Sequence, residues 1–170
     1  MAATVGILLL AATLLFAPLH TALILAGDDG TEYAAFPLRE GESFSVTFVH
    51  SVNKSPVTDV YEIRDGIITV VQTVYYAFGA GVQTEIEEGQ TLSYGPDGEM
   101  IVSGFDRPLP NLSYIVGTVS DHTLTIDGAE VSLRALCGRN STVRFSFARR
   151  SLLRLTDIGQ PAGRPEQLSR

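Results

Sequence analysis

Residues 44–76 read FSVTFVHSVNKSPVTDVYEIRDGIITVVQTVYY and contain three strand-like runs joined by two turn signals. Apolar and polar side chains alternate along the first run from Phe44, which is the pattern of a strand with one buried face. The second run ends at Asp65-Gly66, a residue pair that strongly favours a two-residue hairpin turn. The stretch therefore predicts an antiparallel meander at the centre of the fold.

The hairpin turn also predicts which side chains meet. If the residues flanking the turn pair with each other, Asp59 faces Gln72 across the two strands. The loop at 51–56 ends in Pro56 and is expected to return His50 close to Thr58 or Asp59. Because buried polar groups cost about 1–3 kcal/mol unless they are hydrogen-bonded, this trio is either a satisfied network or a ligand site. His50→Ala is then expected to leave Asp59 without a partner.

The remaining chain favours an all-β fold. Val, Ile, Thr, Tyr and Phe dominate its middle, and Gly and Pro recur between short alternating runs. Many short strands at regular spacing predict an antiparallel β-sandwich, or a partly open barrel, of about 9–12 strands. One of these strands is expected over 122–126, with His122 in a surface-turn context at its start, and another is expected over 129–136.

A hydrophobic segment without charged residues occupies 5–26, where Pro18 and His20 interrupt it. We expect one N-terminal hydrophobic helix within 1–18, acting as an export segment or membrane anchor, then the sandwich domain over 19–156 and a disordered tail over 157–170. An uncleaved anchor would hold the domain on the extracytoplasmic side of the cytoplasmic membrane. Cleavage of the leader would instead give a secreted protein.

Charge argues against nucleic acid as a partner. The net charge is −7, and the first hundred residues hold 13 acidic against 3 basic side chains. A nucleic-acid-binding domain normally has the opposite balance. Cys137 is the single cysteine, which excludes an intrachain disulfide. No cofactor is predicted.

The sequence gives little support for catalysis. His50-Ser51 with Asp59 invites a serine-hydrolase interpretation, but adjacent strand residues point to opposite faces, so His50 is poorly placed to take a proton from Ser51. His50 and Asp59 are also the only weak candidates for metal ligands, because the chain lacks the ligand spacing of a known metal site. We therefore assign neither catalytic residues nor a metal site.

Two loops are candidates for contact with a partner or ligand. Lys54 is suited to an anionic group, although a solvated loop lysine is the simpler interpretation. Phe78 precedes Gly79 and Gly81, whose freedom of backbone conformation permits close approach of another molecule or, alternatively, a tight bend.

The run HSVNKSPVTDVYEI, followed after the hairpin by TVYYAFGAG, resembles the signature of the domain-of-unknown-function 1850 family. The matching positions are His50, Ser51, Pro56, Val57, Asp59, Tyr61, Phe78, Gly79, Ala80 and Gly81. Two positions depart from the family pattern, because Asp59 stands where Glu is usual and Ser55 where Thr is usual. The shorter Asp59 side chain weakens any mechanism that needs one fixed carboxylate position.

The resemblance implies a small exported protein whose gene often lies beside a TRAP transporter of the TAXI type. On this basis the chain is expected to be a membrane-anchored extracytoplasmic accessory or binding module of that transporter, without catalysis. Its expected partners are the membrane subunit of the transporter, the solute-binding protein, or both. A stand-alone exported protein that binds an ion or small ligand is the alternative, and a hydrolase is the third.

Overall fold

The structure is a computed structural model that describes residues 2–51, 54–76 and 85–155. These residues form eleven strands, two α-helices and one 3-10 turn. In chain order they are α1 (Ala2–Phe16), β1 (His20–Ala26), β2 (Glu32–Pro37), β3 (Ser43–Val49), β4 (Pro56–Arg64), β5 (Ile67–Tyr75), β6 (Thr91–Tyr94), β7 (Met100–Pro108), β8 (Ser113–Ile115), β9 (His122–Ile126), β10 (Ala129–Ser132), α2 (Leu133–Cys137), β11 (Thr142–Arg150) and η1 (Leu152–Arg154). The predicted all-β fold with an N-terminal helix is confirmed.

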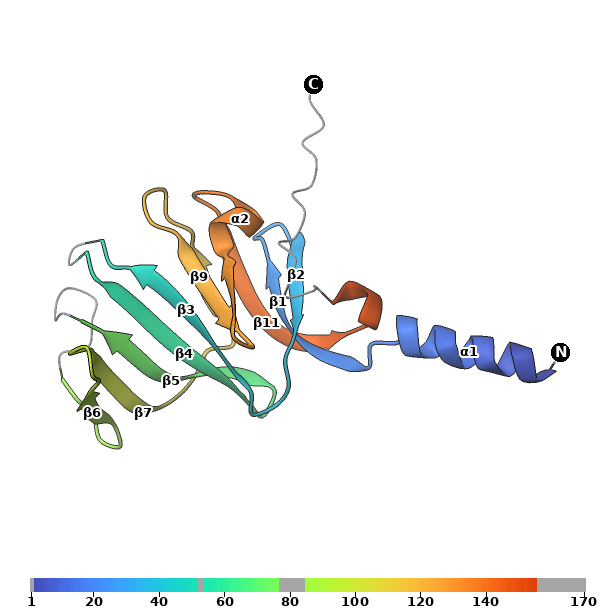
Figure 1. The fold of residues 1–170 in the computed structure, drawn as a ribbon, viewed down its shortest axis with the longest axis horizontal. Coiled ribbons are helices and arrows are strands. Elements are labelled where there is room, and N and C mark those ends of the chain that lie inside the picture. The colour runs from blue at the N-terminus through green and yellow to red at the C-terminus, as the bar shows by residue number, and fades with distance from the viewer. Residues whose placement is uncertain (1, 52–53, 77–84, 156–170) are drawn as a thin grey trace, which may run out of the picture.

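The strands form two antiparallel sheets (Figure 1). One sheet has four strands in the order β2-β1-β11-β8, and the other has seven in the order β10-β9-β3-β4-β5-β7-β6. Within the described part of the chain the two sheets share no strand pairing, so the fold is an open sandwich and not a closed barrel. The meander β3-β4-β5 predicted from residues 44–76 lies at the centre of the larger sheet.

The main hydrophobic core fills the space between the sheets. Leu23, Leu25 and Phe36 enter it from the smaller sheet, and Phe44 and Val46 enter it from β3. Phe44 stacks on Phe145 of β11 with ring centroids 6.0 Å apart. These inward residues alternate with outward ones along their strands, which is the period-two pattern from which the fold was predicted.

The β4–β5 hairpin has the predicted turn but not the predicted pairing along its whole length. Arg64 pairs with Ile67 as expected. An irregularity between Val60 and Tyr61 then shifts the register by one residue, so that Asp59 pairs with Thr73. The predicted pairing of Asp59 with Gln72 is wrong, because one extra residue in a bulge exchanges the two faces of the strand beyond it.

The predicted strand at 129–136 is wrong in its second half. β10 ends at Ser132 and the helix α2 begins at Leu133. The Ser132 hydroxyl accepts a hydrogen bond from the backbone N–H of Ala135 at 2.9 Å, which satisfies a donor at the start of the helix. Gly138 ends the helix at φ 86°, a conformation that favours glycine.

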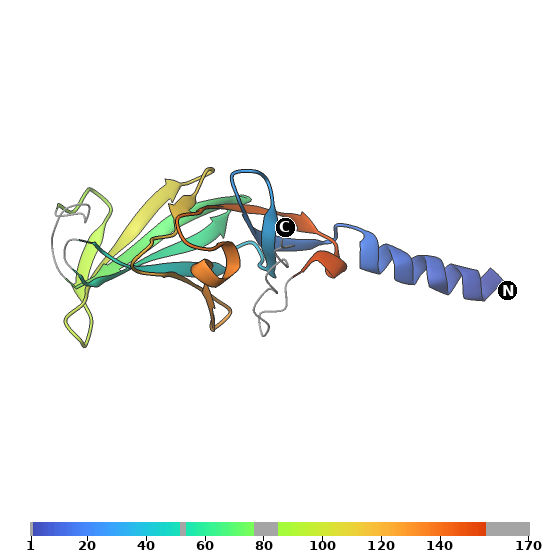
Figure 2. The same cartoon turned by 90° about the horizontal axis from the view of Figure 1, so that it is seen from above.

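The helix α1 stands off from one end of the sandwich, and β6 and β7 lie toward the opposite end (Figures 1 and 2). We call the end beside α1 the helix end. The other, which carries the turn between β3 and β4, is called the distal end. None of the described helices is long and apolar enough to cross a membrane.

Candidate functional site

The polar side chains inside the sandwich gather around Asp59 on β4. One of its carboxylate oxygens accepts a hydrogen bond from Thr73 Oγ1 at 2.8 Å, and the other accepts one from the Tyr114 hydroxyl at 3.1 Å. The Tyr61 and Tyr114 hydroxyls are hydrogen-bonded to each other. We call Asp59, Tyr61, Thr73 and Tyr114 the Asp59 network.

The network exists because residues from three strands and both sheets converge. Asp59 and Tyr61 lie two residues apart on β4 and so share its inward face. The register shift in the hairpin places Thr73 of β5 beside Asp59. Tyr114 comes from β8 in the other sheet, so its hydrogen bonds join the two layers of the sandwich.

Burial sets the protonation behaviour of the network. Loss of solvent raises the pKa of Asp59, and the hydrogen bonds from Thr73, Tyr114 and Tyr61 oppose that rise without cancelling it. Burial together with the nearby Asp59 carboxylate raises the pKa of both Tyr61 and Tyr114. Both phenols therefore stay protonated at neutral pH and remain available as hydrogen-bond donors.

An aromatic wall borders the network on the side of β9. Phe48 stacks on His122 at a centroid distance of 5.4 Å, and Tyr114 packs against the same imidazole at 5.5 Å. His122 Nδ1 is buried and makes no hydrogen bond within the described part of the chain. Burial lowers the pKa of His122, so the ring is neutral at pH 7.

Asp121 fixes the backbone that carries His122. Its carboxylate accepts hydrogen bonds from the backbone N–H of His122 at 2.7 Å, from the backbone N–H of Arg134 at 3.0 Å and from the Ser132 hydroxyl. The start of β9 is thereby tied to the start of α2. The predicted strand over 122–126 is confirmed as β9. The surface-turn context expected for its first residue is wrong, because His122 is half-buried, pairs with Phe48 of β3 and lies beside the network.

The structure does not bring the predicted trio of His50, Asp59 and Gln72 together. Asp59 pairs with Val46, which is four residues or about 13 Å along the strand from His50. Gln72 pairs with Val60, so it lies on the opposite face of the sheet from Asp59. None of the described hydrogen bonds of Asp59 comes from either residue.

The other predicted site residues that the structure describes lie at the distal end. His50, Ser51 and Lys54 belong to the turn between β3 and β4, where the Lys54 N–H donates to the His50 carbonyl at 3.0 Å. Lys54 and Ser51 are exposed, and Lys54 has a positive φ of 55°. Phe78, Gly79 and Gly81 are outside the described residues.

The geometry limits the chemistry that these residues perform together. A serine hydrolase with Ser51 as nucleophile would need His50 as its base and a carboxylate that orients His50. Asp59 lies too far along the strand from His50 to be that carboxylate. No group of three His, Cys, Asp or Glu side chains that would hold a metal ion occurs among the described residues. What the Asp59 network does is satisfy a buried carboxylate with hydroxyl donors and link the sheets.

A second candidate region is the apolar surface at the helix end. Most described side chains of α1 are exposed although the helix sequence is AATVGILLLAATLLF, without a charged residue. Phe16 is 68% exposed and Leu19, which follows the helix, is 51% exposed. Large apolar side chains grouped in this way make this surface a candidate for contact with lipid or another protein.

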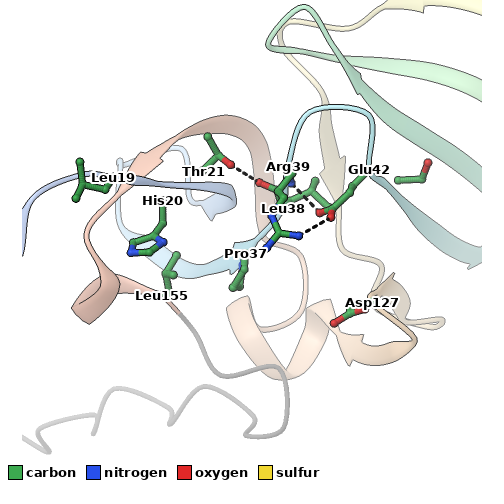
Figure 3. A pocket seen from close by; sticks show the side chains of 10 residues that line it. Leu19, His20, Thr21, Pro37, Leu38, Arg39, Glu42, Asp127 and Leu155 are labelled. Carbon is green, nitrogen blue, oxygen red and sulfur yellow. Dashed lines mark hydrogen bonds and ion pairs between the residues drawn. The ribbon is translucent and has the colours of Figure 1, made fainter. Parts of the chain in front are cut away.

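An open pocket of about 680 Å³ lies beside this surface (Figure 3). Leu19, His20 and Leu155 line the side nearest α1, and Arg39 and Glu42 form an ion pair of 3.5 Å on another wall. Arg39 and Glu42 are both well exposed, so this pair contributes little to stability. The pocket therefore has apolar, acidic and basic walls, and its charged side chains are exposed and of both signs.

Comparison with protein families assigns the chain. The family model described as "Domain of unknown function (DUF1850)" matches residues 44–133. The chain belongs to this family. Searches of curated proteins and of solved structures returned no significant match. The matched region covers β3 to β10, including the Asp59 network and His122, whereas α1 and η1 lie outside it.

Sequence reasoning missed Thr73, Tyr114 and His122. The register shift that selects Thr73 leaves no local signature, because 69–75 alternate equally well in either frame. Tyr114 lies 55 residues from Asp59 in sequence, and only the packing of the two sheets shows that they meet. The one available signal was the position of Asp59 on the apolar side of its strand, since a buried carboxylate requires hydrogen-bond donors and a tyrosine hydroxyl elsewhere in the core is one.

Proposed function

We propose that this chain is a membrane-tethered accessory or binding module on the extracytoplasmic side of the cytoplasmic membrane, associated with a TRAP transporter of the TAXI type. The observation that carries the proposal is the exposed, uncharged helix α1 at one end of the sandwich. Membership of the DUF1850 family supports it, because the resemblance to that family implies a gene beside such a transporter.

The tether follows from the apolar character of α1. Exposing a helix with apolar side chains all round to water is unfavourable in free energy. Contact with a bilayer or with another apolar protein surface removes that cost. In the proposed arrangement α1 enters the membrane and the helix end of the sandwich faces it. The distal end then projects away from the bilayer, toward the extracytoplasmic components of the transporter.

The turn between β3 and β4 is the proposed contact with the transporter. Lys54 is exposed in this turn and is the one lysine of a chain whose net charge is −7. Its ammonium group suits a carboxylate on a partner protein. The Asp59 network has a supporting role here, because it ties β4, one of the two strands from which the turn projects, to β5 and β8.

Co-purification from native membranes tests this proposal. The tagged full-length chain is extracted in mild detergent, and the captured proteins are identified by mass spectrometry. We expect the wild type to recover the TAXI membrane subunit or the solute-binding protein, and Lys54→Ala to recover less. Arg39→Ala, which removes an exposed base at the helix end, is the matched control and is expected to behave as the wild type.

Failure to recover any transporter component with the wild type would contradict the accessory role. A stand-alone ligand-binding protein is the second candidate, and the buried, unbonded Nδ1 of His122 favours it. That nitrogen would accept a hydrogen bond from a bound ligand. A thermal-shift screen of ions and small anions against the wild type and His122→Phe distinguishes the two, because only the second candidate predicts stabilisation that the substitution removes.

A further inference from the structure

The turn η1 presents two leucines to the outside instead of burying them. Leu152 is 46% exposed and Leu153 is 60% exposed. The turn is closed by backbone hydrogen bonds from Arg154 to Ser151 at 3.0 Å and from Leu155 to Leu152 at 3.2 Å. Leu155 packs on the outer side of the smaller sheet against a cluster that contains Ala22 and Ile24. A fixed turn therefore holds both leucines outward.

This turn lies beside the membrane tether proposed above. η1 and α1 contact each other, and Figures 1 and 2 show the turn next to the C-terminal end of the helix. Phe16 at that end of α1 and Leu19 just after it are also exposed. The exposed side chains of η1 therefore extend the apolar surface of α1 onto the sandwich itself.

Arginines flank the exposed leucines. Arg149 and Arg154 are both exposed, and neither forms an ion pair with another described residue. Arg150 between them differs, because its Nη2 lies 2.7 Å from Glu32 Oε2. In a chain with a net charge of −7, two exposed arginines next to these leucines in the sequence give this segment a local charge of opposite sign.

We propose that η1 is a second membrane contact, with Leu152 and Leu153 at the level of the lipid headgroups and acyl-chain boundary and with Arg149 and Arg154 on anionic headgroups. Exposed apolar side chains flanked by arginine are the composition of protein surfaces that bind the interface of anionic membranes. A second copy of the chain fits less well, because two such surfaces would bring like charges together.

The inference rests on the proposed tether and adds an orientation to it. A single helix leaves a domain free to tilt over the bilayer, whereas a second contact beside the helix restricts that tilt. The surface does not continue over the whole helix end, because the pocket carries Glu42 and Asp127 on its far side and anionic lipid would repel them. The proposed contact is therefore confined to η1 and the adjoining end of β11.

Tryptophan fluorescence tests the inference, because the chain contains no tryptophan. The full chain is reconstituted into phosphatidylcholine vesicles with and without phosphatidylglycerol, and with brominated lipids that quench tryptophan at acyl-chain depth. Three single variants are compared: Leu153→Trp in η1, Phe16→Trp in the tether, and Tyr94→Trp at the distal end. All three positions are at least 60% exposed, so the substitutions should be tolerated, and circular dichroism checks this.

We expect brominated lipid to quench Leu153→Trp and Phe16→Trp at least about twofold more than Tyr94→Trp, because apolar side chains at such a surface are buried in the acyl-chain boundary. Phosphatidylglycerol should strengthen the quenching of Leu153→Trp, and Arg149→Gln with Arg154→Gln should remove that increase. If Phe16→Trp is quenched but Leu153→Trp is not, the second contact is overturned and the tether stands. If neither is quenched, both fall. A blue-shifted but unquenched Leu153→Trp would indicate a second copy of the chain and would also overturn the inference.

Discussion

Asp59 is a carboxylate in the interior of the sandwich, where its hydrogen-bond donors are the hydroxyls of Thr73 and Tyr114. Burial disfavours its charged form and raises its pKa, and the hydroxyls of Thr73 and Tyr114 recover part of that cost. The sequence identified Asp59 from its place on the apolar side of an alternating run. It gave no indication of which donors would satisfy the carboxylate.

Asp59→Asn is predicted to change how stability depends on pH. Because the pKa of Asp59 is higher in the folded protein than in the unfolded chain, the folded state holds this proton more tightly. Asp59 therefore stabilises most at low pH, and its contribution is lost as the pH rises through the folded pKa. Urea unfolding at pH 4 and pH 7 should show the Asn variant gaining stability relative to the wild type at the higher pH. A constant difference between the two proteins would contradict the raised pKa.

Tyr114→Phe is predicted to destabilise the protein by about 1.5–3 kcal/mol, the usual contribution of a hydrogen bond to a charged group. The substitution leaves one oxygen of Asp59 without its donor and removes the polar link between the sheets. Thermal and urea unfolding measure the loss. Tyr94→Phe is the control, because Tyr94 is 67% exposed and its substitution should cost less than about 0.5 kcal/mol. Equal effects at both tyrosines would contradict the structural role of the network.

The hairpin shows where element-level prediction succeeds and where it fails. The Asp65-Gly66 turn correctly predicted that Arg64 pairs with Ile67, since the turn determines the pairing next to it. The turn could not predict the register shift after Val60, because the sequence of β5 is compatible with either set of its residues facing the core. A single inserted residue was enough to exchange Gln72 for Thr73 as the neighbour of Asp59.

The two register alternatives predict opposite mutational results. Thr73→Val should cost about 1.5–3 kcal/mol, because it removes a hydrogen bond to Asp59 while conserving shape. Gln72→Val should change the free energy of unfolding by less than about 0.5 kcal/mol, since Gln72 lies on the outer face. Denaturant unfolding of both variants decides the register, and the reverse order of effects would restore the pairing of Asp59 with Gln72.

The short helix α2 and the pairing of His122 with Phe48 were beyond the reach of local patterns. The residues 129–136 alternate well enough to predict a strand, but Ser132 caps a helix through Ala135, and Asp121 accepts from the backbone of Arg134. These contacts join segments that are separated in sequence. They override the weak strand preference of a short run and place His122 beside Phe48.

At the scale of the whole molecule, the alternation of apolar and polar residues was sufficient to predict two packed antiparallel sheets. The order of strands was not predictable in this way, because β11 and β1 are neighbours although most of the chain separates them. That pairing is also what brings η1 to the C-terminal end of α1. The molecule consequently has an apolar helix end and, opposite it, a distal end that carries Lys54.

Cross-linking through the single lysine in native membranes is the most direct test of the accessory role. An amine-reactive photo-cross-linker attaches at Lys54 and at the N-terminus, and Lys54→Arg leaves only the N-terminus. Adding Arg39→Lys to that variant moves the lysine to the helix end. The account predicts an adduct with a transporter subunit that Lys54→Arg abolishes and Arg39→Lys does not restore. If the wild type gives no adduct beyond that of Lys54→Arg, the proposed contact at the distal end is contradicted.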